Sequence, residues 1–165
     1  MAEITYKGTP LHTVGELPAV GTKAPDFELT GTDMSTVSLS DFAGGNLVLN
    51  IFHSLDTGTC ATSVRAFNER AAGLEGTTVL CVSKDLPYAL TRFCGAEGIE
   101  NVVVASDFRT DFGGAYGVTY ADGTLRGLLA RAVVVIDPEG TVLYTEQVAE
   151  TRNEPDYDAA LAAIS

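Results

Sequence analysis

The segment LVLNIF at residues 47–52 decides the fold. An almost continuously apolar run of this length predicts a strand buried on both faces, as in a sheet that is covered by helices on each side. A polar segment follows at 53–59, and a helix is then expected from roughly Gly58 to Gly73, with an apolar face formed by Val64, Phe67, Ala71 and Leu74. Residues 47–73 therefore predict a strand–helix unit of an α/β protein.

The chain on either side extends the same pattern. We expect strands at 77–82 and 102–104, a helix through Leu86, Leu90 and Phe93, a short helix at 109–116, a hairpin of 132–136 and 142–145 around the turn 137–140, and a closing helix at 157–164. A helical turn is expected at 40–45, and an N-terminal hairpin joins 4–6 to 11–14 through a turn at 7–10. These elements predict one domain, residues 1–165, built as a three-layer α/β sandwich with a mixed central sheet.

Composition excludes several classes of partner. The 10 basic and 22 acidic side chains give a formal net charge of −12, and such a surface repels nucleic-acid backbones and anionic lipids. The apolar runs are far shorter than a membrane span. Residues 1–20 contain no apolar secretory segment. We therefore expect a soluble, cytoplasmic protein that binds neither nucleic acid nor membrane.

The three cysteines, Cys60, Cys81 and Cys94, are too few and too widely spaced for a disulfide scaffold or a zinc site. The chain has only two histidines, His12 and His53. We therefore expect no metal and no other cofactor. In a reducing compartment, cysteines with a function are usually catalytic or redox-active.

The positions of the cysteines separate their roles. Cys81 lies inside the strand at 77–82, which predicts an inert core thiol. Cys60 falls in the first turn of a helix, where free N–H groups and the helix dipole favour a thiolate. Lowering a thiol pKa by two units takes roughly 2.7 kcal/mol, and a helix end supplies about 1 kcal/mol, so a nearby cation is needed. Position alone leaves Cys60 either reactive or structural, and it favours a plain core role for Cys94.

Residues 50–65, with Thr57 and Cys60 at their centre, resemble the peroxidatic site of the bacterial thiol peroxidases, the atypical two-cysteine branch of the peroxiredoxins. Segments 21–27, 82–87, 92–98 and 129–137 are similar to that branch in the same order. The resemblance covers nearly the whole chain. It implies a thioredoxin-like fold and a homodimer.

The resemblance also implies an activity and its residues. Cys60 would be the peroxidatic cysteine, Cys94 the resolving cysteine, and Arg131 the active-site arginine, while Thr57 would hydrogen-bond the thiolate and the peroxide. The enzyme would reduce hydrogen peroxide and organic hydroperoxides through a Cys60 sulfenic acid and an intramolecular Cys60–Cys94 disulfide, recycled by a thioredoxin-like reductant. From the residues alone, Thr57 could be only a helix cap and Arg131 an exposed charge at a strand start.

One residue departs from the family pattern P-x-x-x-T-x-x-C, because His53 stands where the proline belongs. His53 could slow a working site, assist it as an imidazolium or a base, or disable it. We favour the first reading, under which replacing His53 with proline raises the peroxide rate. Two other functions remain: a general thiol–disulfide oxidoreductase, against which the missing C-x-x-C argues, and a redox-sensing or interaction domain whose peroxidase activity His53 has weakened.

Overall fold

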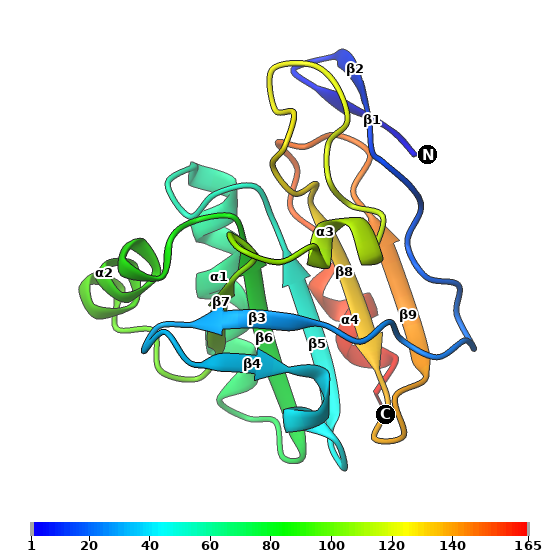
Figure 1. Cartoon of the computed structure of the whole chain (residues 1–165). Helices are drawn as coiled ribbons and strands as arrows, with labels where there is room; N and C mark the ends of the chain where they lie inside the picture. Colours follow the sequence, from blue (N-terminus) through cyan, green and yellow to red (C-terminus); the bar gives the residue numbers. More distant parts are fainter. Residues whose placement is uncertain (1, 165) are drawn as a thin grey trace.

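The computed structural model describes residues 2–164 and is built on a seven-stranded sheet in the order β4-β3-β7-β6-β5-β8-β9 (Figure 1). Its strands are β3 (Glu28–Gly31), β4 (Thr36–Ser38), β5 (Asn46–Ile51), β6 (Thr77–Ser83), β7 (Val103–Ser106), β8 (Ala132–Ile136) and β9 (Val142–Gln147). The helices are α1 (Gly58–Ala71), α2 (Pro87–Glu97), α3 (Phe112–Ala115) and α4 (Tyr157–Ala162), with a 3₁₀ turn η1 (Leu39–Phe42). A separate hairpin pairs β1 (Glu3–Tyr6) with β2 (Thr9–His12).

The sheet is mixed, as the sequence predicts. Strands β5, β6 and β7 run parallel, whereas β8 pairs with β5 in the antiparallel direction and aligns Ala132 with Ile51. The start of β8 therefore lies at the same edge of the sheet as the end of β5. This register brings Arg131, which precedes β8, next to the loop that leads into α1.

Alternation along β5 builds an apolar core on each face of the sheet. Leu49 and Ile51 belong to one cluster, which includes Phe112 and Tyr116 around α3. Val48 belongs to the other, which includes Phe67 of α1 and further residues of α2 and α4. Figure 1 shows α3 on one side of the sheet and α1 with α4 on the other. The predicted three-layer, thioredoxin-like sandwich is confirmed.

Two details of the prediction were wrong. The N-terminal turn spans two residues rather than four, because Lys7 and Gly8 both adopt positive φ and Tyr6 already pairs with Thr9. Strands β3 and β4 were not predicted at all. They are short and rich in threonine, serine and glycine, and β3 joins the sheet only through its pairing with β7, which is a tertiary contact that no local pattern shows.

Candidate active site

Cys60 lies in the first turn of α1, as predicted, and its side chain is fully buried. Thr57 caps the helix: its hydroxyl oxygen accepts a hydrogen bond from the Cys60 amide at 3.4 Å and donates to the Ser54 carbonyl at 3.2 Å. Thr57 therefore has the cap role that the sequence left open. The cap fixes the start of the helix and so the position of the sulfur.

Arg131 supplies the cation that a helix end alone cannot replace. Its Nη2 donates to Cys60 Sγ at 3.1 Å, and its Nε donates to the Thr151 carbonyl at 3.0 Å. The side chain is fully buried, so the interpretation as an exposed charge at a strand start is wrong. Its backbone carbonyl accepts from Gln147 Nε2 at 2.9 Å, which holds the residue against β9.

His53 is a second residue whose side chain contacts the Cys60 sulfur. Its Nδ1 is 3.6 Å from Cys60 Sγ, and the side chain is only 7% exposed. It follows the end of β5, so the strand that positions α1 also positions the imidazole. The departure from the pattern P-x-x-x-T-x-x-C thus lies in direct contact with the Cys60 sulfur.

These neighbours reverse the effect of burial on Cys60. Burial by itself raises the pKa of the thiol, but the hydrogen bond to His53, the charges of Arg131 and His53 and the Thr57 hydroxyl together lower the pKa to about 6. Cys60 is therefore mainly a thiolate at neutral pH, the form that acts as a nucleophile.

A cavity of about 290 Å³ is lined by the three residues that contact Cys60, namely His53, Thr57 and Arg131, although Cys60 itself does not line it. Its lining comes from four separate parts of the chain and consists of Tyr6, His53, Thr57, Gly58, Thr59, Arg131, Thr151 and Arg152. Arg131 Nη1 has no hydrogen-bond partner among residues 2–164, although it is buried. An arginine that holds a thiolate with one nitrogen and leaves a second free can bind an oxygen atom of a small polar molecule in the cavity.

The other two cysteines differ from Cys60. All three thiols are free. Burial raises the pKa of Cys81 in β6 to about 12, which fits its predicted inert role. Burial also raises the pKa of Cys94, which lies half-buried on α2 and does not line the cavity. The structure thus brings Cys60, Thr57 and Arg131 into contact, whereas Cys94 lies on α2 and contacts none of them through a hydrogen bond within residues 2–164.

Two residues of the site escaped sequence reasoning. Thr151 positions Arg131 through its backbone carbonyl, and its hydroxyl is hydrogen-bonded to the buried Tyr120 hydroxyl. A backbone oxygen carries no sequence signal. Tyr120 lies in the irregular segment before β8, where no periodicity indicates which way a side chain points.

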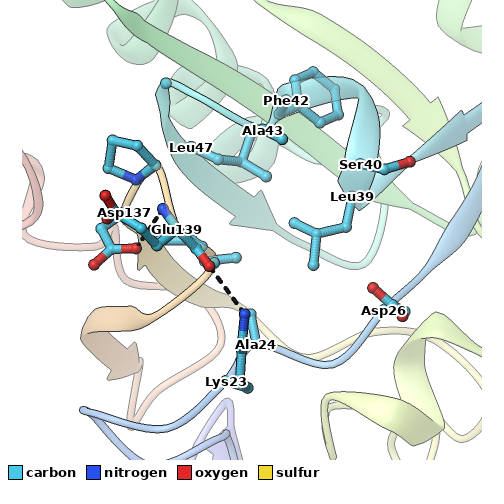
Figure 2. Close-up of a pocket in the computed structure, with 14 residues that line it drawn as sticks. Lys23, Ala24, Asp26, Leu39, Ser40, Phe42, Ala43, Leu47, Asp137 and Glu139 are labelled. Carbon is cyan, nitrogen blue, oxygen red and sulfur yellow. Dashed lines mark hydrogen bonds between the residues drawn. The ribbon is translucent and has the colours of Figure 1, made fainter.

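A second cavity, of about 180 Å³, lies at the opposite end of β5, where Leu47 begins the apolar run. Figure 2 shows Lys23, Asp26, Leu39 and Phe42 around it. Its residues include no cysteine or histidine. Within residues 2–164, no cluster of three or more histidine, cysteine or acidic side chains is arranged to hold a metal ion, and no helix is long and apolar enough to cross a membrane.

Comparison with known proteins agrees with this geometry. Residues 19–161 match the Redoxin family. The chain is 62% identical over 164 residues to a thiol peroxidase of Mycobacterium tuberculosis, covering 99% of each chain, and 57% identical over 165 residues to one of Corynebacterium glutamicum, covering all of both. A crystal structure of a peroxiredoxin-like protein from Aquifex aeolicus superimposes with a TM-score of 0.95 at 40% identity, covering 99% of this chain and 96% of that one.

A thioredoxin-like sheet with a thiolate at a helix N-terminus and an arginine against its sulfur defines a peroxiredoxin-type enzyme. The chain belongs to the thiol peroxidases of the Redoxin family.

Proposed function

We propose that the enzyme reduces hydrogen peroxide and organic hydroperoxides at Cys60. The observation that carries this proposal is the Arg131 guanidinium, which contacts the Cys60 sulfur at 3.1 Å through Nη2 and has no hydrogen-bond partner for Nη1 within residues 2–164, while the residue lines the cavity. One side chain thereby stabilises the nucleophile and offers a donor to the oxygen under attack.

The first step forms a sulfenic acid on Cys60. The thiolate attacks the terminal peroxide oxygen, the sulfur–oxygen bond forms as the oxygen–oxygen bond breaks, and the leaving oxygen departs as water or an alcohol after gaining a proton. The sulfur is oxidised and the peroxide is reduced. A free donor at Nη1 and a thiolate with a pKa of about 6 support this step.

In the second step, the Cys94 thiol condenses with the sulfenic acid, which releases water and forms a Cys60–Cys94 disulfide. Disulfide formation needs the two Cα atoms within about 7 Å, and Cys94 lies on a different helix outside the cavity. Exposed ion pairs from Arg65 to Glu97 and from Arg92 to Asp56 connect the two helical regions. For Cys60 to reach Cys94, the first turn of α1 must unwind locally. Such ion pairs contribute only about 0–1 kcal/mol each, so they oppose this unwinding weakly.

A thioredoxin-like dithiol then restores both thiols by exchange.

We further propose that the enzyme acts as a homodimer. Leu86 and Phe108 follow the ends of the adjacent parallel strands β6 and β7, and both are exposed together with Tyr88. A second copy would cover these apolar side chains. Analytical ultracentrifugation tests this proposal: the wild type should sediment as a dimer and a Tyr88→Glu variant as a monomer.

The test of the catalytic proposal is to add one equivalent of cumene hydroperoxide to the reduced enzyme, quench with an alkylating reagent and map the cysteines by peptide mass spectrometry. The proposal requires a Cys60–Cys94 disulfide with Cys81 alkylated. Recovery of Cys60 as an alkylated thiol would refute it and would favour a redox-sensing or interaction domain. The lowered pKa of Cys60 argues against the weakened peroxidase activity on which that alternative rests.

A further inference from the structure

The imidazole of His53 is placed to exchange a proton with the reacting sulfur. Its Nδ1 is 3.6 Å from Cys60 Sγ, and this is the only hydrogen bond of the ring within residues 2–164. The side chain also lines the 290 Å³ cavity, together with Thr57 and Arg131, which contact Cys60 as well. We propose that His53 takes the proton of the Cys60 thiol, holds it as an imidazolium beside the thiolate, and delivers it to the oxygen that leaves the peroxide.

Among the charged groups around His53, the Cys60 thiolate is the one that can balance the positive charge of an imidazolium. The other ionisable side chains that line the cavity are Tyr6 of β1 and the two arginines, Arg131 and Arg152, and no carboxylate lines it. Asp85 holds the adjacent loop, but its oxygens accept from Ser54, Leu55 and Ser83. Cys60 is therefore the anion that faces His53 directly.

Oxidation of Cys60 removes that anion. Once the sulfur has become a neutral sulfenic acid, an imidazolium would remain in a cavity with two arginines and no carboxylate. Transfer of its proton to the departing oxygen removes this uncompensated charge at the moment when that oxygen needs a proton.

The proton balance closes without any further reactant. Cys60–SH and neutral His53 give Cys60–S⁻ and His53–H⁺. The thiolate then takes the terminal oxygen of ROOH with its hydrogen, the oxygen–oxygen bond breaks, and the departing RO⁻ takes the proton from His53. The products are Cys60–SOH, ROH and neutral His53. A proline at this position can neither hold nor donate a proton, so the contact favours assistance over the expected slow but working site.

This inference rests on the proposed peroxidase activity, and the test separates the two. Three reagents are compared on the reduced enzyme at neutral pH: iodoacetamide, whose iodide leaves without a proton; peracetic acid, whose carboxylate leaves as a stable anion; and tert-butyl hydroperoxide, whose alkoxide needs a proton. Each rate constant is divided by the Cys60 thiolate fraction, which the pH dependence of alkylation supplies. The key variant is His53→Asn, which keeps a polar atom near Nδ1 but cannot carry the proton.

We expect His53→Asn to lower the normalised rate with tert-butyl hydroperoxide about 10²-fold or more, within the usual range for general acid catalysis, and to leave the other two reagents within about twofold of wild type. The wild-type rate with tert-butyl hydroperoxide should also fall at alkaline pH, where alkylation stays level. His12→Asn, at the only other histidine, should change none of these rates. Thermal unfolding checks that each variant folds, and His53→Gln replaces His53→Asn if it does not.

Equal losses with all three reagents, no loss with any, or faster reduction of tert-butyl hydroperoxide by His53→Pro would each overturn the role of His53. If wild-type Cys60 reacts with iodoacetamide but with neither peroxide, the proposed function itself fails.

Discussion

Replacing Arg131 with methionine tests the electrostatic basis of the site. The Nη2–Sγ distance of 3.1 Å corresponds to about 5 kcal/mol for point charges at an effective dielectric constant of about 20. The guanidinium charge is spread over atoms that lie farther away, so about half of this, ~2.5 kcal/mol, is a reasonable expectation. This is roughly 2 pKa units. The pKa of Cys60 should therefore rise from about 6 to roughly 8.

The consequence at neutral pH is a fall in the thiolate fraction from roughly 90% to roughly 10%, so alkylation of Cys60 should slow about tenfold. Peroxide reduction should fall further, because the variant also loses the free Nη1 donor. A positioned donor of this kind contributes roughly 10²–10³ in rate. The combined loss with hydrogen peroxide is then on the order of 10³–10⁴-fold.

Two measurements check this: the pH dependence of iodoacetamide alkylation of Cys60, and the second-order rate constant with hydrogen peroxide. Arg126→Met, at an exposed arginine in the segment before β8, is the matched control and should behave as wild type. Removing one partner of a buried charge pair destabilises a fold, so thermal unfolding first checks that Arg131→Met is folded at the temperature of the rate measurements. An alkylation midpoint that stays near pH 6 would refute the assignment of Arg131 as the counter-ion of the thiolate.

Three further predictions concern the rest of the site. Thr57→Ala removes the cap of α1 and should lower the free energy of unfolding by about 1 kcal/mol in urea titrations and raise the pKa of Cys60, whereas Thr57→Ser should change neither. In Cys94→Ser, peroxide should leave Cys60 as a sulfenic acid that dimedone traps, whereas Cys81→Ser should still form the disulfide. A trapped sulfenic acid in both variants would contradict the assignment of the resolving cysteine. Hydrogen bonds from the Thr5 hydroxyl and from the backbone of Lys7, Gly8 and Arg152 lower the pKa of Glu150 to about 2. This lowered pKa contributes stability that is present above the carboxyl's ordinary pKa and lost as the pH falls toward 2. Glu150→Gln should therefore lower the unfolding temperature at neutral pH, with a difference from wild type that shrinks in acid; a constant difference would refute this.

Local patterns predicted most of the framework. The apolar run at 47–52, the helical spacing that follows it and the turn at 137–140 each correspond to an observed element, because burial on two faces and amphipathic periodicity are visible in single segments. The short strands β3 and β4 were missed, because they are stabilised by pairing with each other and with β7 rather than by their own composition.

For the candidate site, too, some features could be predicted from local patterns and others depend on tertiary contacts. The sequence by itself determined that Cys60 begins a helix after a buried strand, that Cys81 is a core thiol, and that a thiolate at Cys60 needs a cation beyond the helix end. The family resemblance named Arg131, but no local pattern did, and only the tertiary structure shows that Arg131 and His53 both contact the sulfur. Arg131 is 71 residues from Cys60 along the chain, and the antiparallel pairing of β5 with β8 brings its guanidinium to the sulfur. The His53 ring, only seven residues from Cys60 along the chain, contacts the sulfur at the same edge of the sheet. The contact of Arg131 could not be predicted from a local pattern, because contacts between residues far apart in sequence depend on strand order and register, and neither is encoded in any one segment.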